Sequence, residues 1–212
     1  MLTLQSNQSN WDDYLKYGER LFFKRKSTIF KEGTIGKEGF YFLQKGVVKV
    51  YTTTFTGKER TIDIMFSGQV FGEQTVDRQP YFSTARAFED SVVYFLPYWK
   101  LHDLMKEDHA LRLLICDALR TKLDLLLNNL LIQSLPAEQL MAVYLLRISM
   151  QYNNHIPLTQ QEISKYTGLT RITIYKIFKK WESNQLILVG NKNITINDLQ
   201  RIEEIAAIPD KK

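Results

Sequence analysis

Hydroxyl, amide and basic side chains are concentrated in residues 158–190, near the C-terminal end of the sequence. Thr159 and Glu162 have the spacing of a capping box, which begins a helix, and Gly168 allows the tight turn that would end it. After this turn apolar residues recur at helical spacing and are expected to face inward: Ile174, Ile177, Phe178 and Trp181. The opposite face of this second helix carries cations and hydroxyls, the groups that bond phosphates and base edges.

Two short helices separated by a glycine turn, the second with a basic face, predict a helix-turn-helix whose second helix enters the major groove of DNA. The alternative is a helical hairpin whose lysines are only solvated. Arg171 could donate a pair of hydrogen bonds to guanine or bind a phosphate, whereas Lys176 would supply a point charge. The residues expected to contact DNA are Thr159, Gln160, Gln161, Thr170, Arg171, Ile172, Thr173, Tyr175, Lys176, Lys179, Lys180 and Lys192.

The elements that flank this segment are predicted from their local patterns. Residues 186–189 and 194–196 read as two strands joined by a turn at Gly190, which would form a small wing. Asn197 could cap a last helix through about Ala207. An apolar helix is predicted before the segment, at about residues 137–151.

Residues 20–99 have the pattern of β structure. Short runs rich in aromatic and β-branched residues, such as 40–43, 47–54 and 60–66, are separated by turns at residues 44–46 and 55–58. Many short strands with glycine turns indicate a sandwich or barrel.

Residues 108–134 predict one long amphipathic helix. Its first apolar stripe has the four-three-four spacing of a heptad seam and is expected to dimerise: Leu119, Leu123, Leu126 and Leu130. A second stripe, expected to lie on the β domain, contains Leu111, Leu114, Ala118, Leu125 and Ile132. The alternative is that both stripes are buried in one monomer core. Pro136 marks the hinge, because the residue before a proline disfavours the helical conformation.

The composition narrows the class of protein. The 212 residues carry a net charge of +5, which fits nucleic-acid binding without requiring it. Cys116 is the single cysteine and excludes an internal disulfide; it is either a packed small residue or a thiol whose oxidation across a dimer changes DNA affinity. The polar N-terminal stretch lacks a signal-peptide pattern, and no run approaches the roughly 18 apolar residues of a membrane span. We expect a cytoplasmic protein without a membrane segment.

The order of these elements resembles the Crp/Fnr family of bacterial transcription regulators. Residues 29–33 (IFKEG) and 41–46 (YFLQKG) look like the opening strands of its cyclic-nucleotide-binding barrel. Residues 70–73 (VFGE) look like the start of its phosphate-binding cassette, and residues 169–176 (LTRITIYK) look like its recognition helix.

The resemblance implies an α+β protein with three parts. They are an N-terminal jelly-roll-like β barrel over residues 1–107, a dimerisation helix and hinge over 108–135, and a winged helix-turn-helix domain over 136–212. It also implies a homodimer that binds double-stranded DNA at a palindromic promoter site and contacts RNA polymerase. No nucleophile–base pair or phosphate-cradling glycine loop suggests an enzyme.

The cassette departs from the pattern of cyclic-AMP binders. Tyr81 or Phe82 stands where an arginine would clamp the phosphate, and Arg86 comes too late. The helix positions that would contact the nucleobase match Leu125 and Leu126. The candidate effector site is Gly72, Glu73, Tyr81, Phe82, Ser83, Thr84, Leu123 and Leu126. Either it takes a small organic effector, such as an aromatic compound, near Tyr81, Phe82 and Phe88, or these rings fill the core and no effector exists.

Other chemistries of such barrels are disfavoured. An iron–sulfur cluster needs several cysteines, and a haem sensor or metal-dependent barrel enzyme needs histidines, but His102, His109 and His155 all lie outside residues 1–101. We therefore expect no cofactor and no metal. A cyclic-nucleotide-binding module that regulates a protein partner is the remaining alternative.

The recognition helix also departs from the family. Ile172 stands where many members have a glutamate that reads a G·C pair. An aliphatic side chain cannot accept a hydrogen bond from cytosine, but it can pack on a thymine methyl. We therefore predict an A/T-richer palindrome with half-sites roughly 34 Å apart, one helical turn of DNA.

Overall fold

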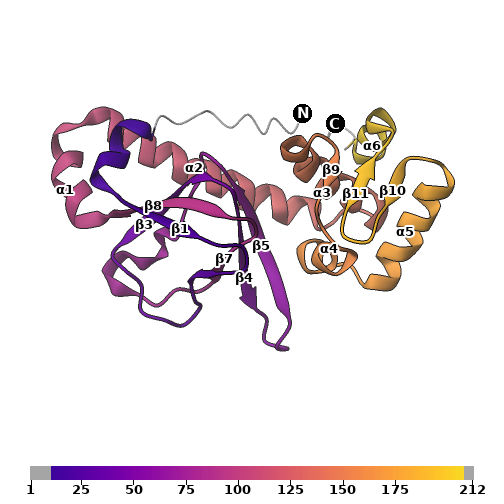
Figure 1. Cartoon of the computed structure of the whole chain (residues 1–212), viewed down its shortest axis with the longest axis horizontal. Coiled ribbons are helices and arrows are strands. Elements are labelled where there is room, and N and C mark those ends of the chain that lie inside the picture. The colour runs from indigo at the N-terminus through magenta and orange to yellow at the C-terminus, as the bar shows by residue number, and fades with distance from the viewer. Residues whose placement is uncertain (1–10, 208–212) are drawn as a thin grey trace. The chain divides into compact units, whose positions relative to one another are not determined.

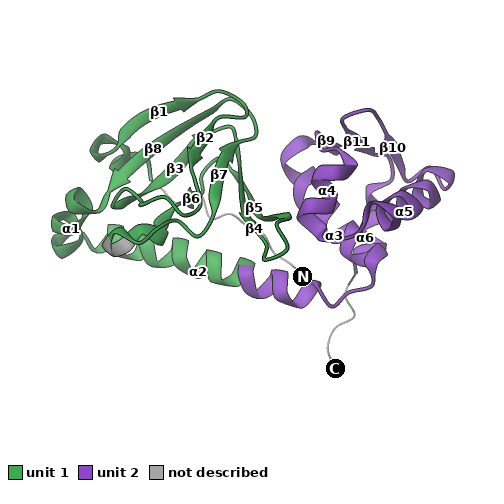
Figure 2. Ribbon diagram, turned by 90° about the horizontal axis from the view of Figure 1, so that it is seen from below, with its two compact units in different colours: residues 1–125 green, residues 126–212 purple. Residues whose placement is uncertain are grey.

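The computed structural model describes residues 11–207 of the chain. The chain divides into two compact units, residues 1–125 and residues 126–212, which Figure 2 shows in green and purple. The long helix α2 (His109–Ile132) begins in the first unit and ends in the second.

The first unit is built on two four-stranded antiparallel sheets (Figure 1). One sheet has the strand order β1-β8-β3-β6 and the other β2-β7-β4-β5, so strands adjacent in space are mostly distant in sequence. The strands are β1 (Glu19–Phe23), β2 (Thr28–Phe30), β3 (Gly39–Lys45), β4 (Val47–Thr53), β5 (Glu59–Phe66), β6 (Val70–Phe71), β7 (Thr84–Ala87) and β8 (Ser91–Pro97). These sheets, followed by helices, confirm the predicted α+β fold class.

The predicted turns between strands are confirmed. Gly46 joins β3 to β4 with a φ of +102°, a value that L side chains rarely adopt. Residues 54–58 join β4 to β5, and the Thr54 N–H donates to the Lys58 carbonyl over 2.8 Å.

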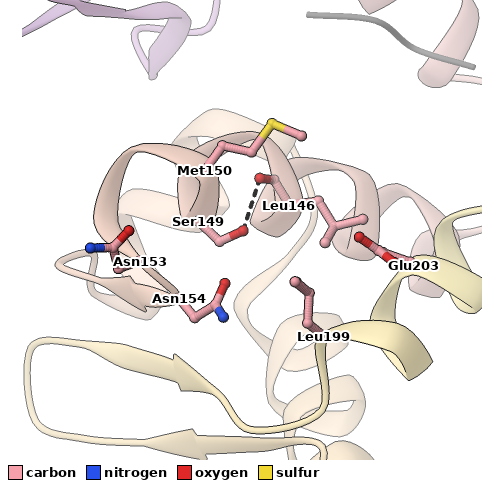
Figure 3. A pocket seen from close by; sticks show the side chains of 7 residues that line it. All are labelled: Leu146, Ser149, Met150, Asn153, Asn154, Leu199 and Glu203. Carbon is pink, nitrogen blue, oxygen red and sulfur yellow. Dashed lines mark hydrogen bonds between the residues drawn. The ribbon is translucent and has the colours of Figure 1, made fainter.

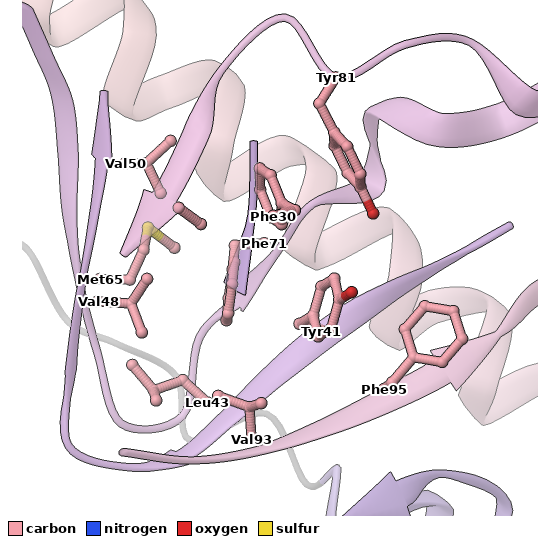
Figure 4. Close-up of a cluster of buried hydrophobic side chains, with 11 residues drawn as sticks. Phe30, Tyr41, Leu43, Val48, Val50, Met65, Phe71, Tyr81, Val93 and Phe95 are labelled. Carbon is pink, nitrogen blue, oxygen red and sulfur yellow. The ribbon is translucent and has the colours of Figure 1, made fainter. Parts of the chain in front are cut away.

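Aromatic rings from both sheets fill the interior of the first unit (Figure 4). Tyr81 is 3% exposed and stacks on Phe30, with ring centroids 4.0 Å apart and planes inclined by 10°. Tyr41 stacks on Phe71 with centroids 5.3 Å apart. Stacked pairs of this kind stabilise a core by about 1 kcal/mol per pair beyond the burial of apolar area.

A second apolar cluster joins the sheets to three helical segments: η1 (Asp12–Tyr17), α1 (Tyr98–Glu107) and the start of α2. Trp11, Leu101 and Leu111 are buried in this cluster. Asp108 fixes the beginning of α2, since its carboxylate accepts hydrogen bonds from the Leu111 N–H and the Tyr14 hydroxyl, each over 2.9 Å. The same two donors, the Leu111 N–H first, lower the pKa of Asp108.

The two apolar stripes of α2 have different environments. Leu111 and Ile132 are buried, and Leu114 and Ala118 pack against the second cluster. The seam residues Leu119, Leu123, Leu126 and Leu130 are all more than half exposed, and Cys116, seven residues before Leu123, is exposed as well. The alternative in which one monomer core buries both stripes is therefore wrong.

The second unit combines the end of α2 and four further helices with a small sheet. After the break at Pro136 come α3 (Ala137–Tyr152), β9 (His155–Ile156), α4 (Gln160–Thr167), α5 (Arg171–Ser183), β10 (Ile187–Val189), β11 (Ile194–Ile196) and α6 (Leu199–Ala206). The sheet has the order β10-β11-β9, so the two wing strands are extended by a third strand that was not predicted from the sequence. The cap of α6 was also misplaced by one residue, because Asp198 and not Asn197 accepts the Arg201 N–H, over 2.9 Å.

Two turn glycines allow a matched test of packing in the first unit. Gly46 and Gly57 both have positive φ, but a Cβ at Gly46 would lie 2.5 Å from Ser91 Oγ, whereas a Cβ at Gly57 meets no atom within 4 Å. We expect Gly57→Ala to cost about 1 kcal/mol through the left-handed backbone, and Gly46→Ala to cost about 1–3 kcal/mol more through overpacking. Urea unfolding of both variants measures the difference, and equal losses would contradict it.

Candidate nucleic-acid interface

Local hydrogen bonds set up the helix-turn-helix of the second unit. The Thr159 hydroxyl accepts from the Glu162 N–H over 3.2 Å while the Glu162 carboxylate accepts from the Thr159 N–H over 2.8 Å, which confirms the predicted capping box. Gly168 ends α4 with a φ of +79°. Thr170 then caps α5, its hydroxyl accepting the Thr173 N–H over 3.1 Å.

The inner face of α5 is buried as predicted. Ile174, Ile177, Phe178 and Trp181 are all buried. On α4, the ring of Tyr166 stands edge-on to that of Tyr144 of α3, with 4.5 Å between centroids. The Trp181 indole N–H donates to Glu138 Oε1 over 2.8 Å, which ties the last turns of α5 to the first turn of α3. The orientation of α5 within the unit is therefore fixed by packing and by one carboxylate.

The outer face of α5 combines cations with an apolar pair. Arg171, Lys176 and Lys179 are exposed, and none has an ion-pair partner among residues 11–207. Between them lie Ile172, 70% exposed, and Tyr175, 55% exposed. These five residues define what we term the α5 face. Unpaired cations on one helix face are suited to phosphates, and the side chains of its first turn are suited to base edges.

Lys180 differs from the other predicted contacts. Its ammonium donates to Glu138 Oε2 over 2.8 Å, next to the bond from Trp181. The Lys180 ammonium is the largest cause of the lowered pKa of Glu138. Since Lys180 has a partner within the domain, we do not include it in the α5 face, and its contact with phosphate stays a prediction.

The threonines expected to contact DNA are also bonded internally. Thr170 Oγ1 and Thr173 Oγ1 lie 2.9 Å apart, and Thr159 is engaged in its capping box. Gln160 and Gln161 occupy the first turn of α4. Lys192 is exposed in the turn between the wing strands, where the Gly190 N–H donates to the Asn193 carbonyl over 2.9 Å.

The cassette residue Glu73 has partners within its own chain. It begins the short helix η2 (Glu73–Arg78) directly after Gly72, whose φ is +78°. Its carboxylate forms an ion pair with Lys122 of α2, and its carbonyl accepts the Tyr98 hydroxyl over 2.9 Å. Burial, and then the charge of Glu73, raise the pKa of Tyr98 to about 12. In the sequence, Lys122 stands out only as a charge that interrupts an apolar run, so its role was missed.

Three other polar side chains of the cassette form hydrogen bonds within the first unit. Gln74 donates to Ser83 Oγ over 2.8 Å and accepts the Phe82 N–H over 2.9 Å. Thr84 Oγ1 accepts the Glu32 N–H over 3.0 Å. Tyr81 belongs to the stacked core and does not line an entrance, whereas Phe82 is 65% exposed. This arrangement favours the alternative in which the Tyr81 ring fills the core. Leu123 and Leu126, the other two candidate effector contacts, lie exposed on α2.

Away from the α5 face, the second unit has a hollow of about 280 Å³ between the end of α3 and α6. It is lined by Leu146, Met150, Asn154 and neighbouring side chains (Figure 3). Within residues 11–207, no group of three or more His, Cys, Asp or Glu side chains could hold a metal ion. No helix in that range is long and apolar enough to cross a membrane.

Both units match known domain families. Residues 20–108 match the cyclic nucleotide-binding domain and residues 140–205 match the Crp-like helix-turn-helix domain. The chain belongs to the Crp/Fnr family of transcription regulators. It is accordingly a DNA-binding transcription regulator of the Crp/Fnr type and not an enzyme.

Individual members of the Crp/Fnr family are distant relatives. An anaerobic regulatory protein of Pasteurella multocida (strain Pm70) is 26% identical over 200 residues, which cover 86% of this chain and 72% of that protein. The fumarate and nitrate reduction regulatory protein of Escherichia coli (strain K12) is 26% identical over 200 residues, covering 86% of this chain and 79% of that protein. A CRP/FNR-family transcriptional regulator from Thermus thermophilus shares the fold, with a TM-score of 0.77 and 22% identity over 89% of this chain and 98% of that chain.

Lys179 and Lys180 give a matched test of the α5 face. We expect Lys179→Ala to lower DNA affinity by a similar factor for all sequences and to reduce the salt dependence by about one counterion, since an exposed unpaired cation contacts phosphate. Lys180→Ala should instead reduce thermal stability with little change in the salt dependence, since it removes one of the two partners of the Glu138 carboxylate. Titrations of DNA at several salt concentrations separate the two, and identical slopes for both variants would contradict this assignment.

Proposed function

We propose that two copies of this chain pair through the exposed seam of α2 and bind a palindromic promoter site, with one α5 in the major groove of each half-site. The exposed seam is the main support. Four leucines at heptad spacing on one face of a 24-residue helix form an apolar surface that is unfavourable in water and complementary to its own copy. A parallel pair of such helices has twofold symmetry, which matches a palindrome.

The α5 face is proposed as the DNA-reading surface of each copy. In the first turn of α5, the Arg171 guanidinium can donate two parallel hydrogen bonds to a base, and Ile172 offers a surface for a thymine methyl. Lys176 and Lys179 neutralise phosphates. Gln160, Gln161 and Lys192 are proposed as further phosphate contacts. A dimer of this kind would act in the bacterial cytoplasm, with RNA polymerase as the partner that family membership implies.

Selection of sites from a random DNA pool by the purified protein, with no effector added, tests this function. Recovery of one palindrome, richer in A·T pairs, would support it and indicate a DNA-competent free protein. If nothing is enriched although light scattering shows a folded dimer, the barrel would have to be filled first, and aromatic acids, phenols and cyclic nucleotides would be screened. Enrichment of a single asymmetric site would contradict the palindrome.

The seam itself gives a separate prediction. We expect the double variant Leu123→Glu, Leu126→Glu to be a folded monomer by light scattering, because charge repulsion opposes pairing. Its affinity for the palindrome should fall about 100-fold or more, because a monomer bound at one half-site no longer raises the effective protein concentration at the other. Met150→Glu, which adds a carboxylate at an exposed apolar position of α3, serves as control and should stay dimeric. A dimeric double variant would contradict the proposed seam.

We also propose that the barrel supports DNA binding without an effector. The ion pair between Glu73 and Lys122 joins the cassette to α2, and it is largely shielded, with side chains 29% and 23% exposed. In a ligand-sensing barrel a bound effector would make such a connection. Here the chain makes it by itself, while Gln74 occupies the hydrogen bonds of Ser83 and the Phe82 N–H.

Breaking the pair tests this proposal. We expect Lys122→Met to lower the affinity for the selected site by about fivefold in the absence of any ligand, corresponding to an interaction of about 1 kcal/mol. Glu73→Gln should have a similar effect, and the double variant should be no worse than either single one. Lys106→Met removes an exposed ion pair of α1 with Asp103 and should leave affinity unchanged. Unaltered affinity in Lys122→Met would contradict a role for the pair.

A further inference from the structure

The α5 face carries an apolar pair that the fold does not need. Ile172 and Tyr175 stand three residues apart, so they are neighbours on the helix surface, and both are more than half exposed. The inner face of α5 is completed without them by Ile174, Ile177, Phe178 and Trp181. A surface of this kind, placed among the cations of a DNA-binding helix, indicates an apolar element in the partner.

Few hydrogen-bonding groups compete with this pair at the beginning of α5. The hydroxyls of Thr170 and Thr173 bond to each other over 2.9 Å, and Thr170 also accepts the Thr173 N–H. Because the bond between the two hydroxyls uses one of their two protons, the donors left for a base among the side chains of residues 170–173 are Arg171 and one threonine hydroxyl. A base edge that meets Ile172 away from these donors therefore meets hydrocarbon.

The apolar element of the major groove is the methyl group on pyrimidine C5. Thymine carries it, and 5-methylcytosine carries the same methyl at the same position, whereas uracil and cytosine lack it. We propose that Ile172, flanked by Tyr175, reads this C5-methyl group as such, so that the protein responds to cytosine methylation at the positions where it reads thymine. This inference rests on the proposed function, in which α5 enters the major groove.

The chemistry of the two bases sets an order of affinity. Unmethylated cytosine presents an N4 amino donor for which Ile172 has no acceptor, and it offers no methyl contact. Adding the methyl restores the apolar contact but leaves the amino group, so 5-methylcytosine should rank between thymine and cytosine. Removing the methyl from thymine leaves every hydrogen-bonding group in place, so uracil isolates the apolar contact.

The experiment uses the full-length protein and the palindrome recovered by selection. Each thymine of the half-site is replaced in turn by deoxyuridine in both half-sites, and affinity is measured by titration. Burial of one methyl group corresponds to about fourfold in affinity, so we expect one thymine whose symmetric replacement weakens binding by about fifteenfold. At that position, cytosine and 5-methylcytosine are then compared, each paired with guanine, and methylation should strengthen binding by a similar factor.

Variants assign the effect to the α5 face. Ile172→Ala, at an exposed position, should fold normally and bind thymine and uracil sites with nearly equal affinity. Tyr175→Phe keeps the ring and should retain the discrimination, as should Met150→Ala, which shortens an exposed apolar side chain of α3.

The outcomes separate this inference from the function on which it rests. Failure to bind any selected thymine site would refute the proposed function. Tight binding with equal affinity for thymine and uracil at every position, or discrimination that persists in Ile172→Ala, would overturn the methyl readout alone. A uracil penalty accompanied by a gain from 5-methylcytosine supports the inference, and a uracil penalty without that gain would overturn the response to cytosine methylation.

Discussion

Helix α2 packs one apolar stripe against the first unit and leaves a second stripe, the leucine seam, exposed. Several contacts of the first unit hold the helix in this orientation. Asp108 fixes where the helix begins, and Leu111 is buried directly after it. Lys122 holds a later turn of the helix through its pair with Glu73. With the inward stripe held in this way, the leucines of the seam are left in water, where their exposure is unfavourable until a partner covers them.

The interior of the first unit is filled by apolar side chains of the chain itself. Stacked rings from both sheets occupy the core, and Tyr81 stacks on Phe30 within it. The polar groups that remain lie on the rim of the cassette, where Gln74 and Ser83 satisfy one another. The cassette thus combines a backbone turn at the positive φ of Gly72 with polar side chains that bond within their own chain.

Features determined by neighbouring residues could be predicted from the sequence, and those determined by distant partners could not. The capping box at Thr159, the turn at Gly168 and the buried face of α5 depend on spacings of three or four residues, and the structure has them as expected. Strand β9 has only two residues and exists because β11 pairs with it, so no local pattern reveals it. The partner of Lys180 lies 42 residues away, and that of Lys122 lies 49 residues away. From the sequence, therefore, Lys180 was predicted only as a DNA contact and Lys122 stood out only as a charge within an apolar run.

Glu138 has a mechanical consequence that follows from its place in the chain. It stands two residues after Pro136, and its two carboxylate oxygens bond to Trp181 and Lys180 near the end of α5. Within the second unit, this one carboxylate therefore joins the start of α3 directly to the last turns of α5. A single substitution at Glu138 would remove both bonds at once, so it should loosen α5 more than the loss of either partner alone.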